Sequence, residues 1–162
     1  MNNYIKLVGL TDECFTDYKK PSMYLAFPKC SFKCGSQVCQ NFNLASALSI
    51  EVPITSLCER YLNNPITSAI VCGGLEPFDS YNELYELIKI LRISYNCYDD
   101  IIIYTGYNLQ EISSLLIKLK EYVNIIIKYG RYINNSTSYY NSLLGVTLAS
   151  NNQQAIRIED IE

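Results

Sequence analysis

From residue 66 onward, short apolar runs alternate with longer amphipathic ones, a pattern typical of strand–helix units around a parallel sheet. The short runs are rich in β-branched residues and lack polar alternation, as expected of strands covered on both faces. They lie at residues 68–72, 100–104 and 123–127. Two apolar stripes at helical spacing predict helices between and after them, formed by Leu84, Leu87, Ile88 and Leu91 and by Leu109, Ile112, Leu116 and Leu119. We expect Ser80 and Asn108 to cap them, and the whole pattern predicts an α/β fold.

The first part of the chain continues this pattern around one long loop. Residues 23–27 read as an earlier strand, and residues 53–63 as a helix with proline near its first turn. Between them, residues 28–51 form a loop whose length in so small a protein favours a functional role. After an Asn-, Ser- and Tyr-rich stretch, residues 155–158 read as a last strand. We find no linker and expect one domain over residues 1–162.

Composition and charge narrow the class of protein. A chain of 162 residues with 49% hydrophobic and 18% charged residues is large and apolar enough to fill one core. The net charge is only −3 and the lysines are scattered, so nucleic acid is not an expected partner. The first residues resemble no targeting signal and no apolar run is long enough to span a membrane, so we expect a cytoplasmic protein. Most of the 15 tyrosines are expected to cover the surface.

Seven cysteines and the absence of histidine direct attention to metal or redox chemistry. Cys30, Cys34 and Cys39 lie within ten residues of one another in the long loop. Three thiolates can each hold one iron of a cubane cluster and leave the fourth iron open to a small molecule. Zinc is an alternative, but a closed zinc site needs a fourth ligand and no other cysteine lies at a paired spacing. A third interpretation is that the three thiols only pack or remain free.

The other cysteines have ordinary interpretations. We expect Cys58 and Cys97 to be small apolar core residues and Cys14 to be an exposed thiol. Cys72 ends a predicted strand, and we expect it to pack beneath a cofactor.

Two further motifs follow predicted strands, where ligands bind in open α/β sheets and barrels. The first contains Gly73, Gly74 and Glu76: two glycines whose bare backbone allows close approach of a ligand, and a carboxylate suited to an ammonium group. The second contains Thr105, within Tyr-Thr-Gly-Tyr. Taken alone, a Gly-Gly turn after a strand is more often simple turn chemistry, and the second motif is likewise compatible with an ordinary strand-to-helix turn.

The order of these motifs resembles the radical S-adenosylmethionine (SAM) superfamily, and within it the small activating proteins of anaerobic ribonucleotide reductase. The resemblance extends to residues 149–153, which are similar to a Gly-Ser-x-Asn-Gln element of that family. The chain departs from the family pattern in two places. Its cysteines are separated by three and then four residues, where the family has three and then two, and Leu75 is inserted into Gly-Gly-Glu.

This resemblance implies a shortened, open (β/α) partial barrel of the radical SAM type. It implies a 4Fe-4S cluster on Cys30, Cys34 and Cys39. It also implies SAM bound near a further set of residues, with the cofactors and no protein side chain supplying the catalytic chemistry. The SAM-binding set comprises Gly73, Gly74, Glu76, Thr105 and Asn151.

The implied activity is that of an oxidoreductase that cleaves SAM reductively and generates a glycyl radical on anaerobic ribonucleoside-triphosphate reductase. The electron would come from a donor such as a flavodoxin or ferredoxin. Three alternatives remain: another glycyl-radical partner, a small metabolite as substrate, or a non-enzymatic binding module whose cysteine loop is stabilised by a bound metal or cluster. Lys128 stands at the end of the fourth predicted strand, counted from residues 23–27, where relatives often have an acidic residue. For Lys128 and Arg131, a solvated surface position and a functional one are both open.

Overall fold

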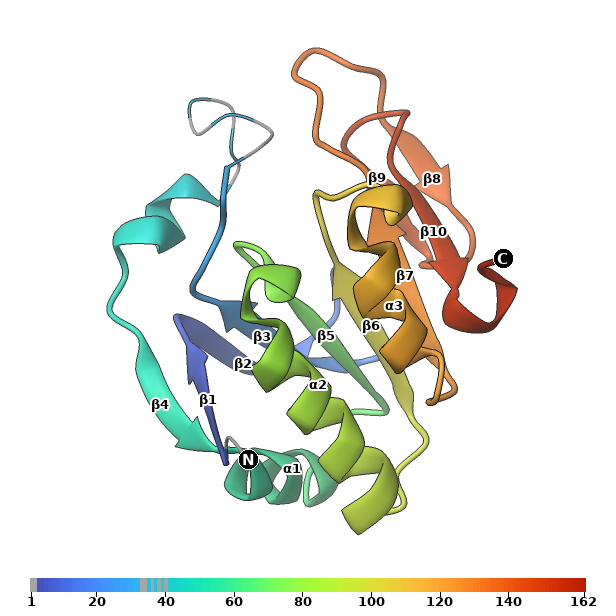
Figure 1. The fold of residues 1–162 in the computed structure, drawn as a ribbon. Coiled ribbons are helices and arrows are strands. Elements are labelled where there is room, and N and C mark those ends of the chain that lie inside the picture. The colour runs from blue at the N-terminus through green and yellow to red at the C-terminus, as the bar shows by residue number, and fades with distance from the viewer. Residues whose placement is uncertain (1–2, 33–34, 36, 38, 40) are drawn as a thin grey trace.

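The computed structural model describes residues 3–32, 35, 37, 39 and 41–162, and its centre is a six-stranded sheet (Figure 1). The strand order is β10-β7-β6-β5-β3-β2. Four neighbouring strands run parallel, namely β3 (Ser22–Phe27), β5 (Ala69–Gly74), β6 (Asp100–Tyr104) and β7 (Ile125–Tyr129). The two edges are antiparallel, formed by β2 (Gly9–Cys14) and β10 (Gln154–Arg157). The fold is therefore mixed α/β with a mostly parallel, open central sheet.

Three helices cover one face of this sheet (Figure 1). They are α1 (Ile54–Leu62), α2 (Tyr81–Lys89) and α3 (Ser113–Leu119). A π-helical turn (Ile90–Ser94) extends α2, and 3-10 turns precede α2 (Pro77–Ser80) and α3 (Leu109–Ile112). Alternate strand residues pack under these helices, and those of β5, β6 and β7 are Ile70, Cys72, Ile101, Ile103, Ile125 and Ile127. The strands supply one layer of this core and the helix stripes supply the other.

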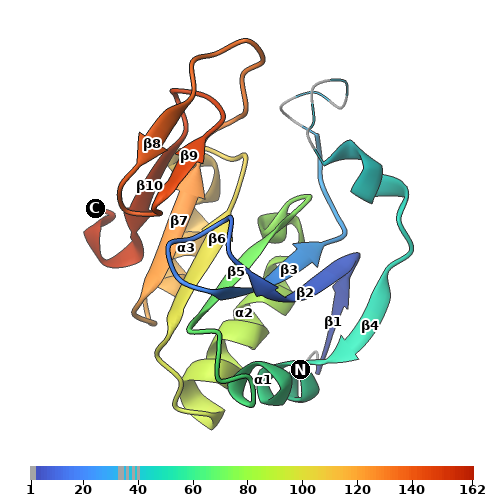
Figure 2. The same ribbon diagram turned by 180° about the vertical axis from the view of Figure 1, so that it is seen from behind.

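The opposite face of the sheet is covered by a β-hairpin (Figure 2). Its strands are β8 (Tyr139–Asn141) and β9 (Val146–Leu148). Leu144 and Leu148 from the hairpin, together with Tyr18, form a second core on the remaining strand residues, which are Ala69, Val71, Ile102 and Ile126. Both faces of the central strands are thus buried, which explains their continuous apolar runs.

A separate antiparallel ribbon completes the fold beside the helices. It pairs β1 (Tyr4–Leu7) with β4 (Ile50–Pro53), and Ile5 and Leu7 enter the helix-side core. A 3-10 turn (Phe42–Ser46) lies between the cysteine loop and β4, and another (Ile158–Asp160) follows β10.

The predicted strands and helices are confirmed, with strand ends that differ by at most two residues, but Leu109 and Ile112 of the second stripe lie in the 3-10 turn before α3. The last parallel strand runs over residues 125–129 instead of 123–127, and helix α1 begins one residue after Pro53. The cap predicted at Asn108 is confirmed, and it forms a capping box with Glu111 at the 3-10 turn before α3. The cap expected from Ser80 is wrong: its hydroxyl makes no capping bond, and the carboxylate of Glu76 accepts the N–H of Phe78 at the start of the preceding 3-10 turn.

Five strands (β1, β2, β4, β8 and β9) were not predicted from the sequence. In the described part of the chain, no helix has both the length and the apolar character that crossing a membrane requires.

Candidate metal centre and adjoining pocket

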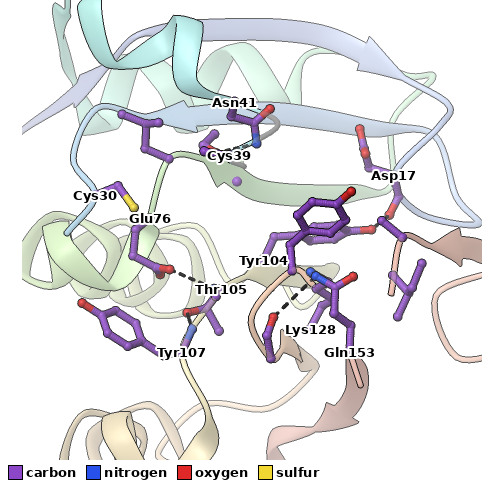
Figure 3. Close-up of a pocket in the computed structure, with 18 of the residues that line it drawn as sticks. Asp17, Cys30, Cys39, Asn41, Glu76, Tyr104, Thr105, Tyr107, Lys128 and Gln153 are labelled. Atoms are coloured by element: carbon purple, nitrogen blue, oxygen red, sulfur yellow. Dashed lines mark hydrogen bonds between the residues drawn. The ribbon is translucent and has the colours of Figure 1, made fainter. Parts of the chain in front are cut away.

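The loops that follow the four parallel strands meet at one edge of the sheet and surround a pocket of about 340 Å³ (Figure 3). This is the edge at which the carboxyl ends of all four strands lie. From the predicted set, the pocket lining includes Cys30, Cys39, Gly73, Gly74, Glu76 and Thr105. The structure therefore brings together three motifs that are far apart in the sequence. Cys34 lies outside the described residues.

Cys30 stands where the chain leaves β3, and backbone contacts fix the residues on either side of it. The carbonyl of Lys29 accepts the N–H of Glu76 at 2.7 Å, and the N–H of Ser31 donates to Oδ2 of Asp79 at 2.7 Å. The sulfur of Cys30 accepts the N–H of Phe32 at 3.2 Å.

The other end of the cysteine loop is held by a second contact to the same strand end. The side-chain amide of Asn41 donates to the carbonyl of Gly74 at 2.9 Å, two residues after Cys39. The rings of Phe32 and Phe42 lie 5.9 Å apart across the loop. Cys30 and Cys39 are therefore both anchored beside the Gly-Gly turn.

Two of the three loop cysteines, Cys30 and Cys39, lie in the described part of the chain, and both line the pocket. Among the described residues, no three His, Cys, Asp or Glu side chains are grouped as a metal site. Cys58, Cys72 and Cys97 are buried in the helix-side core and belong to no such group. The cysteines expected to be core residues are confirmed as such. Cys72 is not beneath the pocket as expected, because it points to the helix side of β5.

Both glycines of the Gly-Gly turn are required by contacts with β3. A Cβ on Gly73 would lie 2.7 Å from the phenol oxygen of Tyr24. Gly74 has a φ of +85°, and a Cβ there would lie 2.7 Å from backbone atoms of Ala26 and Phe27. Packing within the protein, besides any ligand, therefore excludes side chains at these two positions.

Glu76 is buried and ties the β5 loop to the β6 loop. Its Oε2 accepts the N–H of Gly106 at 2.9 Å, and its Oε1 accepts the N–H of Phe78 at 3.1 Å. Burial raises the pKa of this carboxyl to about 7, against the opposing effect of hydrogen bonds from Gly106, Thr105 and Phe78. The predicted pair of Glu76 and Thr105 therefore lies together at the pocket wall.

Residues on the hairpin side of the sheet form the far wall of the pocket (Figure 3). Tyr104 donates to the carbonyl of Asp17 at 2.5 Å, and burial raises the pKa of Tyr24 to about 12. Lys128 is only 9% exposed, with its ammonium 5.5 Å from the ring centre of Tyr104. The solvated interpretation of Lys128 is therefore wrong. Tyr104 belongs to the Tyr-Thr-Gly-Tyr motif, whereas Tyr24 was not predicted from the sequence, because alternation is masked in strands that are apolar on both faces.

Most residues of the predicted element at 149–153 have a structural role, because they form hydrogen bonds to the segment that follows β7. The amide of Asn152 donates to the carbonyl of Arg131 at 2.7 Å, and the hydroxyl of Ser150 accepts the N–H of Ile133 at 3.4 Å. Gln153 is 5% exposed and reaches the pocket wall. Asn151 lies outside this pocket, where its side-chain oxygen Oδ1 accepts the hydroxyl of Ser136 at 3.0 Å. Its expected role in binding SAM stays a prediction.

Comparison with family models gives a match to the 4Fe-4S single cluster domain over residues 22–156. This range begins with β3 and ends within β10, so it includes the whole parallel sheet, the cysteine loop and the pocket. The chain therefore belongs to this iron–sulfur family, and the match supports a 4Fe-4S cluster. No curated protein matches the chain.

Proposed function

We propose that the chain is a radical SAM activating enzyme, formed by a single domain over residues 1–162. Cys30, Cys34 and Cys39 would hold three irons of the cluster and leave the fourth open. The sheet of four parallel strands with helices on one face would correspond to a shortened, open partial barrel. The enzyme would be an oxidoreductase of the cytoplasm, where thiols stay reduced.

The observation that carries the proposal is that the cysteine loop forms part of the pocket wall. Cys30 and Cys39 line the same pocket as Gly74, Glu76 and Thr105. A cluster used only as a structural staple does not need an adjoining pocket of about 340 Å³. That volume falls within the range of about 300–1,000 Å³ that is typical of small-molecule sites.

The walls of this pocket suit the polar groups of SAM. Glu76 accepts hydrogen bonds from Gly106, Phe78 and Thr105, and a carboxylate has about four lone-pair sites, so one site would remain for an ammonium group. Gly73 and Gly74 line the pocket beside the cysteine loop, where the methionine portion would meet their backbone, and Thr105 would contribute its hydroxyl. Asn151 would contribute only to a ligand that extends beyond the pocket.

With both cofactors bound, one electron from the cluster would split a sulfur–carbon bond of SAM and give methionine and a 5′-deoxyadenosyl radical. The residues of this chain bind and orient SAM and exclude water from the site. The electron would come from a partner such as a flavodoxin or ferredoxin.

A protein partner is favoured over a small metabolite because side chains already fill the face of the sheet below the pocket. Tyr18, Leu144 and Leu148 occupy that face and are at most 4% exposed. Once SAM occupies the pocket, little enclosed volume remains for a second small molecule. We therefore propose a glycyl-radical enzyme, and specifically anaerobic ribonucleoside-triphosphate reductase, as the partner whose glycine loses a hydrogen atom.

The test is anaerobic reconstitution followed by addition of SAM and a one-electron reductant. The proposal predicts 5′-deoxyadenosine from the wild-type protein and none from Cys39→Ser. Addition of anaerobic ribonucleotide reductase should then give a glycyl-radical signal in electron paramagnetic resonance. A protein that holds a full cluster but forms no 5′-deoxyadenosine would contradict the proposed activity.

A further inference from the structure

Asp79 joins the loops of three parallel strands through one carboxylate. It lies in the 3-10 turn (Pro77–Ser80) that follows β5. Its Oδ2 accepts the N–H of Ser31 in the β3 loop at 2.7 Å, and its Oδ1 accepts the phenol of Tyr107 in the β6 loop at 2.6 Å. The hydroxyls of Ser31 and Tyr107 lie 3.0 Å apart, which closes the triangle.

This triangle acts directly on the segment that carries the first cysteine. Ser31 follows Cys30 in the chain, so the bond from its N–H fixes the peptide that leaves Cys30. A carboxylate that accepts an N–H forms a charge-assisted bond, which is shorter and stronger than a neutral one. Tyr107 restrains the same carboxylate from the opposite side. The backbone at Cys30 is therefore fixed by a group whose own position is fixed.

We infer that Asp79 is a positioning residue for the cluster, which holds Cys30 in place and sets the charge beside the metal site. The inference rests on the proposed assignment of Cys30 as an iron ligand, and it does not depend on SAM cleavage. Groups that orient metal ligands typically change metal affinity about 10–100-fold when they are removed. Because an iron–sulfur cluster gains negative charge on reduction, a nearby carboxylate also lowers its reduction potential.

The first test is the rate at which a chelator removes iron from the reconstituted full-length protein. We expect Asp79→Asn to speed iron release about tenfold, because the amide group cannot accept both hydrogen bonds. Tyr107→Phe should speed it by a smaller factor, since it removes only one side of the triangle. Glu159→Gln is the matched control, because Glu159 also accepts a backbone N–H at 2.7 Å, from Asn124. Release from Asp79→Asn at the wild-type rate, or equally fast release from Glu159→Gln, would overturn the inference.

The second test is the midpoint reduction potential of the cluster. A general destabilisation of the fold would not shift this potential in one predictable direction, whereas loss of a charge would. Asp79→Asn removes a negative charge and should raise the potential, whereas Tyr107→Phe keeps the charge and should leave it near the wild-type value. Equal potentials in Asp79→Asn and Tyr107→Phe would contradict the charge effect. If the wild-type protein takes up no iron, or Cys30→Ser retains all of it, the ligand assignment itself fails. That result is distinct from failure of the Asp79 inference alone.

Discussion

The phenol oxygen of Tyr24 accepts the backbone N–H of Gly74 at 2.7 Å, and this bond joins β3 to the turn beside the cysteine loop. The same phenol occupies the space that a side chain on Gly73 would need. One tyrosine therefore dictates two features of the Gly-Gly turn, the position of its amide and the absence of a Cβ.

Gly73→Ala should destabilise the protein through this contact. The new methyl group would overlap the phenol of Tyr24, and overpacking of this kind costs about 1–3 kcal/mol. In a Tyr24→Phe background the cost should be smaller, because the oxygen atom at 2.7 Å is gone. Urea unfolding of the two single variants and the double variant measures this coupling.

The control for this cycle is Gly106→Ala, whose Cβ would meet only Glu76 at 3.8 Å, an ordinary contact. If the effects of Gly73→Ala and Tyr24→Phe on the free energy of unfolding simply add in the double variant, Tyr24 is not the residue that excludes a side chain at position 73.

Glu76 should make the stability of the apo-protein depend on pH. The unfolded chain releases this proton near pH 4.5 and the folded chain at about pH 7, so the folded state binds more protons in between. The free energy of unfolding should therefore fall as pH rises through this window, by up to about 3 kcal/mol from this group. Glu76→Gln should lack that part of the slope, as measured by unfolding at a series of pH values. Identical slopes in the two proteins would contradict a raised pKa at Glu76.

The β8–β9 hairpin should contribute to stability as part of the core. Leu144 is fully buried against the sheet, and truncation of such a side chain costs about 2–5 kcal/mol. We expect Leu144→Ala to lower the midpoint of urea unfolding accordingly. Leu48→Ala should have almost no effect, because Leu48 is 93% exposed. Equal midpoints for the two variants would mean that the hairpin is not packed on the sheet.

The sequence predicts the parallel sheet well because its strands are buried on both faces. The runs at β3, β5 and β6 therefore stand out as continuous apolar segments. The edge strand β2 contains exposed polar residues such as Thr11 and Glu13, and β4 contains exposed Glu51, so neither produces such a run. For β7, Asn124 at a φ of 60° ends the preceding turn and delays the strand by two residues.

The convergence of the site could be predicted for a similar reason. Cys30, Gly74 and Thr105 each follow a parallel strand, and the carboxyl ends of parallel strands share one edge. Asp79 and Tyr24 could not be predicted, because their partners lie 48 and 50 residues away in the chain. Contacts of that range depend on the assembled sheet and leave no local pattern.

The most direct test of the account is the metal content and visible spectrum of the protein after anaerobic reconstitution with iron and sulfide. We predict a brown protein with about four irons per chain, and loss of iron in Cys30→Ser, Cys34→Ser and Cys39→Ser. Cys14→Ser is the control and should retain the cluster, because Cys14 ends β2, does not line the pocket and bonds through its sulfur to the side chains of Thr16 and Asp17. A colourless protein that binds zinc, or full iron in the three loop variants, would contradict the account.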